Sequence, residues 1–120
     1  MEKITFLTIA VTRIVLFFVW SSAQFTGQMT DGWHHIYTGV ILMLLSLAVP
    51  KKYSKVVLGI GLGLFLDELI HVFHLLGIVE ETDYWSATSI ITTVVGYCAI
   101  FLFSRTLCYL KSQFHIEKKF

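Results

Sequence analysis

Gly59-Ile-Gly-Leu-Gly-Leu-Phe-Leu-Asp67-Glu68-Leu-Ile-His71-Val-Phe-His74 is the stretch that decides how this chain is interpreted. It joins a glycine repeat to a run of ionisable groups inside an otherwise apolar segment. At about 100° per residue in a helix, Asp67, His71 and His74 fall within an arc of roughly 60°. The glycines lie beside that arc, and small residues let another helix approach closely. The stretch therefore predicts one helix whose face is tight at its start and polar from its middle onward.

The composition places this stretch in a strongly apolar chain. Of its 120 residues, 56% are hydrophobic and 14% are charged, and the mean hydropathy is +0.75. Soluble domains carry about 25% charged residues, so this composition predicts a small integral membrane protein with a single domain, residues 1–120. A net charge of +1 leaves no basic surface for phosphate groups, which excludes nucleic acid as a partner.

Four apolar segments are each near the length of about 20 residues that spans a bilayer. They run from about 4 to 24, 33 to 49, 56 to 79 and 84 to 107, and are followed by a tail at 108–120. Backbone groups in lipid must be paired within a segment, which favours helices. The short connections then predict an all-α, antiparallel bundle of four transmembrane helices.

The distribution of basic residues predicts the orientation of this bundle. Lys51, Lys52 and Lys55 lie in the connection after the second segment, and Lys3 precedes the first. The connections after the first and third segments contain no Lys or Arg. By the positive-inside rule, both termini and the tail are expected in the cytoplasm, in a multi-pass protein of the cell membrane.

Histidines and carboxylates in the second and third segments form the candidate site. His34 and His35 begin the second segment, and antiparallel geometry brings them to the depth of the third segment's ionisable residues. Adjacent helical residues diverge by about 100°, so only one of the two is expected to face His71 and His74. The candidate metal ligands are His34, His35, Asp67, Glu68, His71 and His74, and the candidate catalytic groups are Glu68 and Asp67.

Such a ligand set predicts a divalent metal, zinc above iron, in the outer half of the membrane. Metal-bound water would act as the nucleophile, with Glu68 or Asp67 as ligand or general base. The chain would then be a metal-dependent hydrolase, or another enzyme that acts on a lipid-like substrate. Its partners would be the lipids of the membrane. In this chemistry, histidines near an acid in membrane helices, the chain resembles the intramembrane zinc hydrolases such as the alkaline ceramidases.

Other functions are compatible with the same residues. Two histidines from facing helices could ligate haem in an electron-transfer bundle. A chain of Asp, Glu and His could instead relay protons or metal ions, in a homo-oligomer. Arg13, near the middle of the first segment, is the natural partner of Asp67 or Glu68. That pair would be a structural lock in a non-catalytic interaction subunit. A polar stripe on the fourth segment, Ser86, Ser89, Thr93 and Tyr97, is either a packing face or a cavity lining.

Overall fold

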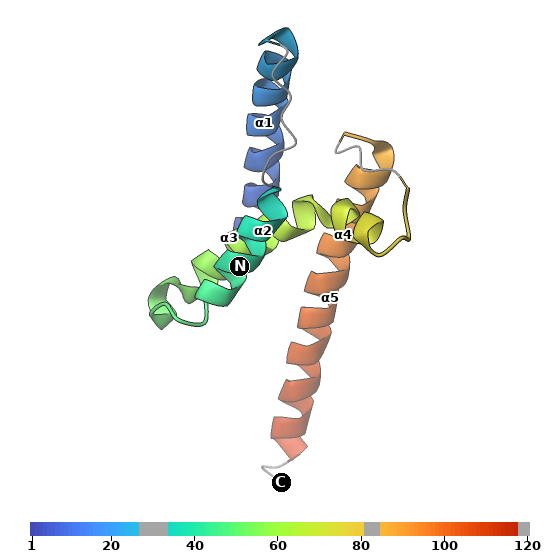
Figure 1. Ribbon diagram of the computed structural model, residues 1–120. Helices are drawn as coiled ribbons and strands as arrows, with labels where there is room; N and C mark the ends of the chain where they lie inside the picture. Colours follow the sequence, from blue (N-terminus) through green and yellow to red (C-terminus); the bar gives the residue numbers. More distant parts are fainter. Residues whose placement is uncertain (27–33, 81–84, 118–120) are drawn as a thin grey trace.

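A computed structural model of the protein describes residues 1–26, 34–80 and 85–117, and within these ranges all of the regular structure is helical. Figure 1 shows α1 and α5 extending in opposite directions from a central region that contains α2, α3 and α4. The helices are α1 (Glu2–Thr26), α2 (His35–Leu45), α3 (Lys51–Asp67), α4 (Leu69–Leu75) and α5 (Ala87–Glu117). The prediction of an all-helical chain is therefore confirmed for the described residues.

The predicted bundle of four transmembrane helices is wrong for this part of the chain. Among the residues that the structure describes, only α5 is by itself long and apolar enough to cross a bilayer, over Ala87–Phe114. Helices α3 and α4 meet the same test only when they are taken together, across a bend of 56°. With 11 residues, α2 is about 17 Å long, well short of a hydrocarbon core of about 30 Å. For α2 and for the α3–α4 pair, helix length and continuity rather than composition separate the structure from the prediction.

Several helix boundaries also differ from those predicted. Helix α2 ends at Leu45, and Pro50 is the N-cap of α3, so the lysines expected in a connection lie in the first turns of a helix. A proline there is favourable because the first turn of a helix does not need its amide hydrogen. Helix α5 continues to Glu117, through most of the predicted tail. Residue 33 of the second predicted segment and residue 84 of the fourth lie outside the described residues.

Glycines allow α2 to pack closely against α3. A Cβ atom on Gly39 would lie 2.7 Å from the backbone oxygen of Gly61, and one on Gly61 would lie 2.8 Å from the oxygen of Gly39. Neither distance leaves room for a side chain. The two backbones therefore touch directly, as in close-packed pairs of membrane helices.

The other face of the α3 glycine repeat receives α1. A Cβ on Gly63 would lie 2.6 Å from the Cβ of Thr8. The buried hydroxyl of Thr5 donates a hydrogen bond to the backbone oxygen of Gly59, at 3.1 Å. The prediction that these glycines admit a neighbouring helix is confirmed, and the contact fixes α1 across α3.

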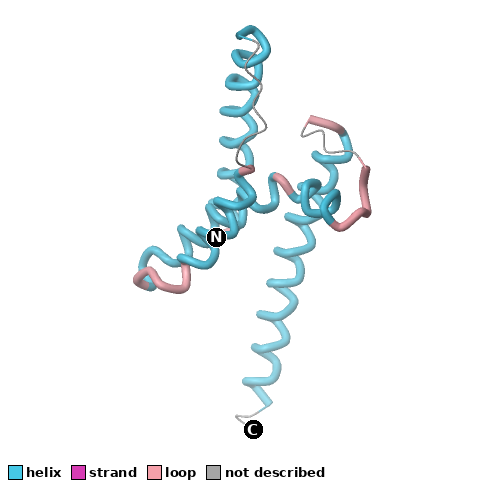
Figure 2. Tube along the Cα trace, viewed as in Figure 1, coloured by secondary structure: helices cyan, strands magenta, loops and turns pink. Residues whose placement is uncertain are grey.

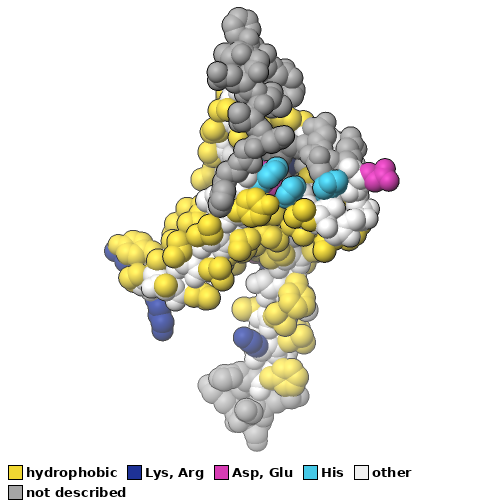
Figure 3. All heavy atoms as spheres, in the orientation of Figure 1, with side chains coloured by type: hydrophobic (Ala, Val, Ile, Leu, Met, Phe, Trp, Pro, Cys, Tyr) yellow, Lys and Arg dark blue, Asp and Glu magenta, His cyan; other side chains and the backbone are white. Residues whose placement is uncertain are grey.

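The molecule is extended, and much of its apolar surface is exposed. Its radius of gyration is 17.4 Å, against about 14 Å for a compact chain of this length. Its accessible surface is 8950 Å², against about 6,600 Å² for a folded monomer of this mass. The buried apolar side chains are Ile36, Leu66, Ile70 and Phe101. Figure 2 shows α1 and α5 diverging from the central helices, and Figure 3 shows apolar side chains over much of the visible surface of the central helices.

Candidate functional site

The site lies at the break between α3 and α4. Asp67 is the last residue of α3, and Glu68 has non-helical backbone angles, φ −106° and ψ 25°, before α4 begins. The backbone oxygen of Asp67 accepts hydrogen bonds from the guanidinium of Arg13, at 3.1 Å, and from the hydroxyl of Thr93, at 3.4 Å. These partners from α1 and α5 take a carbonyl that would otherwise serve the helix. Because the helix breaks here, the consecutive carboxylates of Asp67 and Glu68 point toward different neighbouring residues.

Asp67 is paired with Arg13. The Nε atom of Arg13 lies 2.6 Å from Oδ1 of Asp67, whose side chain is 0% exposed. The guanidinium also donates to the hydroxyls of Ser89 and Thr93, at 3.3 and 3.2 Å, and it lies 5.7 Å from the ring centre of Trp85. This largely buried charge is therefore surrounded by a carboxylate, two hydroxyls and an aromatic face. The prediction that Arg13 binds a carboxylate is confirmed, and the carboxylate is that of Asp67.

The second oxygen of Asp67 faces His35. The Nε2 atom of His35 lies 2.9 Å from Oδ2 of Asp67, and its Nδ1 atom lies 3.5 Å from Oε1 of Glu68. One imidazole thus stands between two carboxylates, with one nitrogen directed at each. A neutral imidazole donates through one nitrogen and accepts through the other, so the position of its proton determines which carboxylate it serves.

Glu68 contacts the start of α2, both through the two histidines there and through a backbone amide. Its Oε1 atom lies 3.1 Å from Nδ1 of His34, and its Oε2 atom accepts a hydrogen bond from the backbone N–H of Ile36, at 3.0 Å. The N–H groups of a first helical turn have no partner within the helix. A carboxylate there satisfies one of them and also interacts favourably with the helix dipole. Both His34 and His35 contact Glu68.

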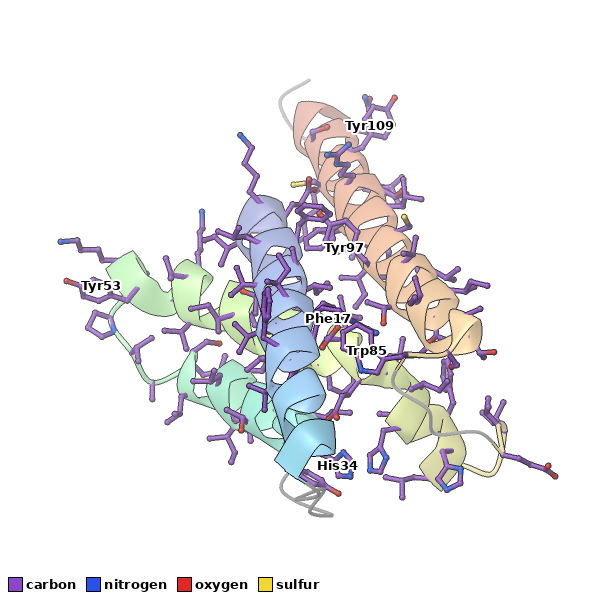
Figure 4. All side chains as sticks on the ribbon, turned by 90° about the horizontal axis from the view of Figure 1, so that it is seen from above. Phe17, His34, Tyr53, Trp85, Tyr97 and Tyr109 are labelled. Atoms are coloured by element: carbon purple, nitrogen blue, oxygen red, sulfur yellow. The ribbon has the colours of Figure 1, made fainter. Side chains whose placement is uncertain are left out.

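The two remaining histidines diverge. His71 stacks on His34, with ring centres 4.1 Å apart and planes inclined by 19°. The Nδ1 atom of His74 lies 3.0 Å from the backbone oxygen of Val79, on the exposed side of α4. Figure 4 labels the His34 side chain, and Figure 3 shows histidine side chains on the visible surface. The break turns α4 away from α3, so Asp67, His71 and His74 do not share the predicted face.

The prediction of a zinc-binding protein is contradicted. Within the described ranges, no group of three or more His, Cys, Asp or Glu side chains is arranged to hold a metal ion. The reason lies in the pairing, because the carboxylate oxygens of Asp67 and Glu68 already face Arg13, two imidazoles and a backbone amide. The interpretation as a zinc hydrolase depended on that set of metal ligands, and the described residues do not form it. Haem binding and the catalytic roles of Asp67 and Glu68 stay predictions.

Two parts of the site were not expected as parts of it. Ser89 and Thr93 belong to the polar stripe of α5, and they bind the guanidinium of Arg13. Their spacing of four residues was the available signal, since it places both hydroxyls on one helical face. The backbone N–H of Ile36 gave no signal, because an amide hydrogen carries no information in a residue pattern.

Comparison of the chain with protein families, with curated proteins and with solved structures found no match.

Proposed function

We propose that this chain is a membrane-associated proton-binding protein, in which His34, Glu68, His35 and Asp67 form a path between the surface and a buried carboxylate. The observation that carries the proposal is the continuity of this path. Its successive nitrogen–oxygen separations are 3.1, 3.5 and 2.9 Å. It begins at a His34 side chain that is 45% exposed and ends at an Asp67 side chain that is 0% exposed.

Imidazole is suited to this task because it takes up a proton at one nitrogen and releases another from the opposite one. His35 has one nitrogen directed at each carboxylate, so a proton received from the side of Glu68 can leave toward Asp67. His34 has one nitrogen directed at Glu68 and a partly exposed ring. Alternating imidazoles and carboxylates are also the groups from which proton relays in membrane proteins are built.

The balance of charge supports binding of a single proton. Asp67 and Arg13 cancel each other at 2.6 Å, which leaves the negative charge of Glu68. Glu68 is 8% exposed, and a buried charge needs a compensating partner. One proton shared by His34 and His35 supplies that charge, whereas a second would give the site a net positive charge. We therefore expect one exchangeable proton per chain.

Exposed apolar surface supports association with a membrane. Large apolar side chains on α1, such as Phe6, Leu7, Ile14 and Phe18, are each more than half exposed, and so are many on α5. Monomeric soluble proteins rarely expose contiguous apolar patches above a few hundred Å². Lipid is a natural cover for such helices, and α5 has the length and composition of one span.

Hydrogen exchange at the imidazole rings tests the proposal. In detergent-solubilised protein with ¹⁵N-labelled histidine, the ring N–H proton of His35 should exchange with solvent through Glu68 and His34. Glu68→Gln keeps the shape of the side chain but cannot pass on a proton, so it should slow this exchange. His74→Gln is the matched control, because Nδ1 of His74 faces the backbone oxygen of Val79, away from the path. Equal exchange of the His35 ring in the wild type and in Glu68→Gln would contradict the proposal.

A second candidate function, a non-catalytic interaction subunit, is favoured by the contacts of Arg13. Its guanidinium joins α1 to the end of α3 and to two hydroxyls of α5. Among the described residues, no buried side-chain nitrogen or oxygen is without a hydrogen-bond partner. Such a network also serves stability alone. In that case Glu68→Gln would lower the free energy of unfolding and leave the solvent exchange of the His35 ring proton unchanged.

A further inference from the structure

A second polar feature lies at the start of α1, where the first turn of this helix meets α5. A cavity of about 590 Å³ opens to the surface there. Its lining consists of Met1, Glu2, Lys3, Ile4, Phe101 and Ser104. Sites for small ligands have volumes of about 300–1,000 Å³ and combine apolar walls with a few polar groups. This cavity has both, and it lies apart from the histidines.

The polar groups around the cavity have an excess of positive charge. Arg105 donates a hydrogen bond to each carboxylate oxygen of Glu2. Its Nε atom lies 3.1 Å from Oε1, and its Nη2 atom lies 2.8 Å from Oε2. The pKa of Glu2 lies below its ordinary value, chiefly because of this hydrogen bond from Arg105. Glu2 and Arg105 thus neutralise each other, and the ammonium of Lys3 is the charge that remains among the side chains that line the cavity.

The apolar wall adds a second requirement for a ligand. Ile4 and Phe101 lie on facing helices, and Phe101 is one of the few buried apolar side chains in the molecule. Tyr97, one turn before Phe101, packs on its ring with centres 4.7 Å apart and donates a hydrogen bond to the backbone oxygen of Glu2. These contacts hold the two walls in place. A ligand that satisfies both the wall and the charges must have an anionic group next to an alkyl chain.

We propose that this cavity binds an anionic phospholipid of the surrounding membrane. Its phosphate would lie beside the ammonium of Lys3, and the start of an acyl chain would lie against Ile4 and Phe101. Charge complementarity selects this occupant over a zwitterionic lipid, because its headgroup carries the net negative charge that offsets Lys3. Basic residues near a membrane surface attract anionic lipids by about 1 kcal/mol each.

Native mass spectrometry of the detergent-solubilised chain, titrated with phosphatidylglycerol or phosphatidylcholine, tests this inference. Phosphatidylglycerol should bind more tightly than phosphatidylcholine. Lys3→Gln should weaken phosphatidylglycerol binding about five-fold, which is the loss of one such charge interaction. Lys51→Gln is the matched control, because it removes the same charge from the exposed first turn of α3, away from the cavity. Ser104→Trp fills the cavity without changing the net charge and should weaken the binding of both lipids.

The outcomes separate a built site from general attraction. Equal losses for Lys3→Gln and Lys51→Gln, or an unchanged affinity in Ser104→Trp, would overturn the inference. If Ser104→Trp does not fold, as judged by its helical circular dichroism, Ser104→Leu replaces it with the same expectation. Inorganic phosphate that displaces the lipid at equal concentration would show a site for free anions, and would also overturn it. None of these measurements depends on the histidines, so they leave the proton proposal unaffected.

Discussion

Arg13 and Asp67 are 54 positions apart in the sequence, yet the Nε atom of one lies 2.6 Å from Oδ1 of the other. This single contact ties α1 to the point where α3 ends. It also decides the chemistry around it, because Arg13 neutralises Asp67, whereas Glu68 faces His34 and the Ile36 amide. The two adjacent carboxylates share His35 but otherwise have different partners and, in our proposal, different tasks.

Loss of the Arg13–Asp67 pair should be costly, and partly recoverable. Arg13→Leu alone leaves a buried carboxylate uncompensated, which typically costs about 3–5 kcal/mol of unfolding free energy. Asp67→Asn in the same chain should recover part of this loss, since it removes the orphaned charge. Denaturant unfolding followed by circular dichroism measures both variants. Arg13→Leu combined with Glu68→Gln is the comparison, and its coupling should be the smaller of the two. Equal coupling would mean that Arg13 does not distinguish the two carboxylates.

The start of α2 should depend on an oxygen atom at position 68. Glu68→Ala removes the acceptor of the Ile36 amide hydrogen, which lies 3.0 Å away. That amide should then exchange with solvent faster, by about ten-fold if the hydrogen bond contributes near 1.5 kcal/mol. Glu68→Gln retains an oxygen at the same distance and should protect the amide. NMR measures the exchange rate of the Ile36 amide hydrogen directly. Equal exchange rates in the alanine and glutamine variants would contradict a hydrogen bond from this amide to the side chain of residue 68.

Close approach of α2 and α3 should make Gly61 intolerant of any side chain. A Cβ atom there would lie 2.8 Å from two backbone atoms, so Gly61→Ala should destabilise the protein by about 1–3 kcal/mol. Gly96→Ala is the matched control, because the nearest atom, 2.6 Å away, is the end of the flexible Leu69 side chain. Helix propensity favours alanine over glycine, so that control should be close to neutral. Thermal unfolding compares the two, and an equal loss of stability would refute the distinction.

Acid should weaken the contact between α1 and α5. The pKa of Glu2 is lowered, mainly by the hydrogen bond from Arg105 and further by its positive charge. A lowered pKa means that the contact contributes fully above the ordinary value for Glu, near 4.3, and is lost as the pH falls through the lowered one. Arg105→Gln should return the titration of Glu2, followed by carboxyl ¹³C NMR, toward the ordinary value. Lys111→Gln, on the same helix, should leave it in place. A Glu2 titration that Arg105→Gln does not change would rule out this cause.

Several features of the site were readable from residue types alone. A guanidinium in an apolar segment requires an anionic partner, and the chain has few carboxylates in comparable surroundings, so Arg13 was paired correctly with the Asp67–Glu68 dipeptide. The glycine repeat beginning at Gly59 predicted close helix contacts for a similar reason, since only small residues allow them. The meeting of His34 and His35 with the carboxylates followed from antiparallel neighbours.

The break at Glu68 was decided by the tertiary structure alone. Helical periodicity extrapolates from one residue to the next at about 100°, and that rule holds only while the helix continues. Partners from three other helices, among them Arg13, Thr93 and the Ile36 amide, bind the backbone of Asp67 or the carboxylate of Glu68 and end α3 there. Beyond that point His71 turns toward His34, and His74 turns outward. The sequence by itself determined which polar groups must be paired, because each has a fixed charge and hydrogen-bonding capacity. The tertiary structure determined which atoms pair, because that depends on where the helices end and cross.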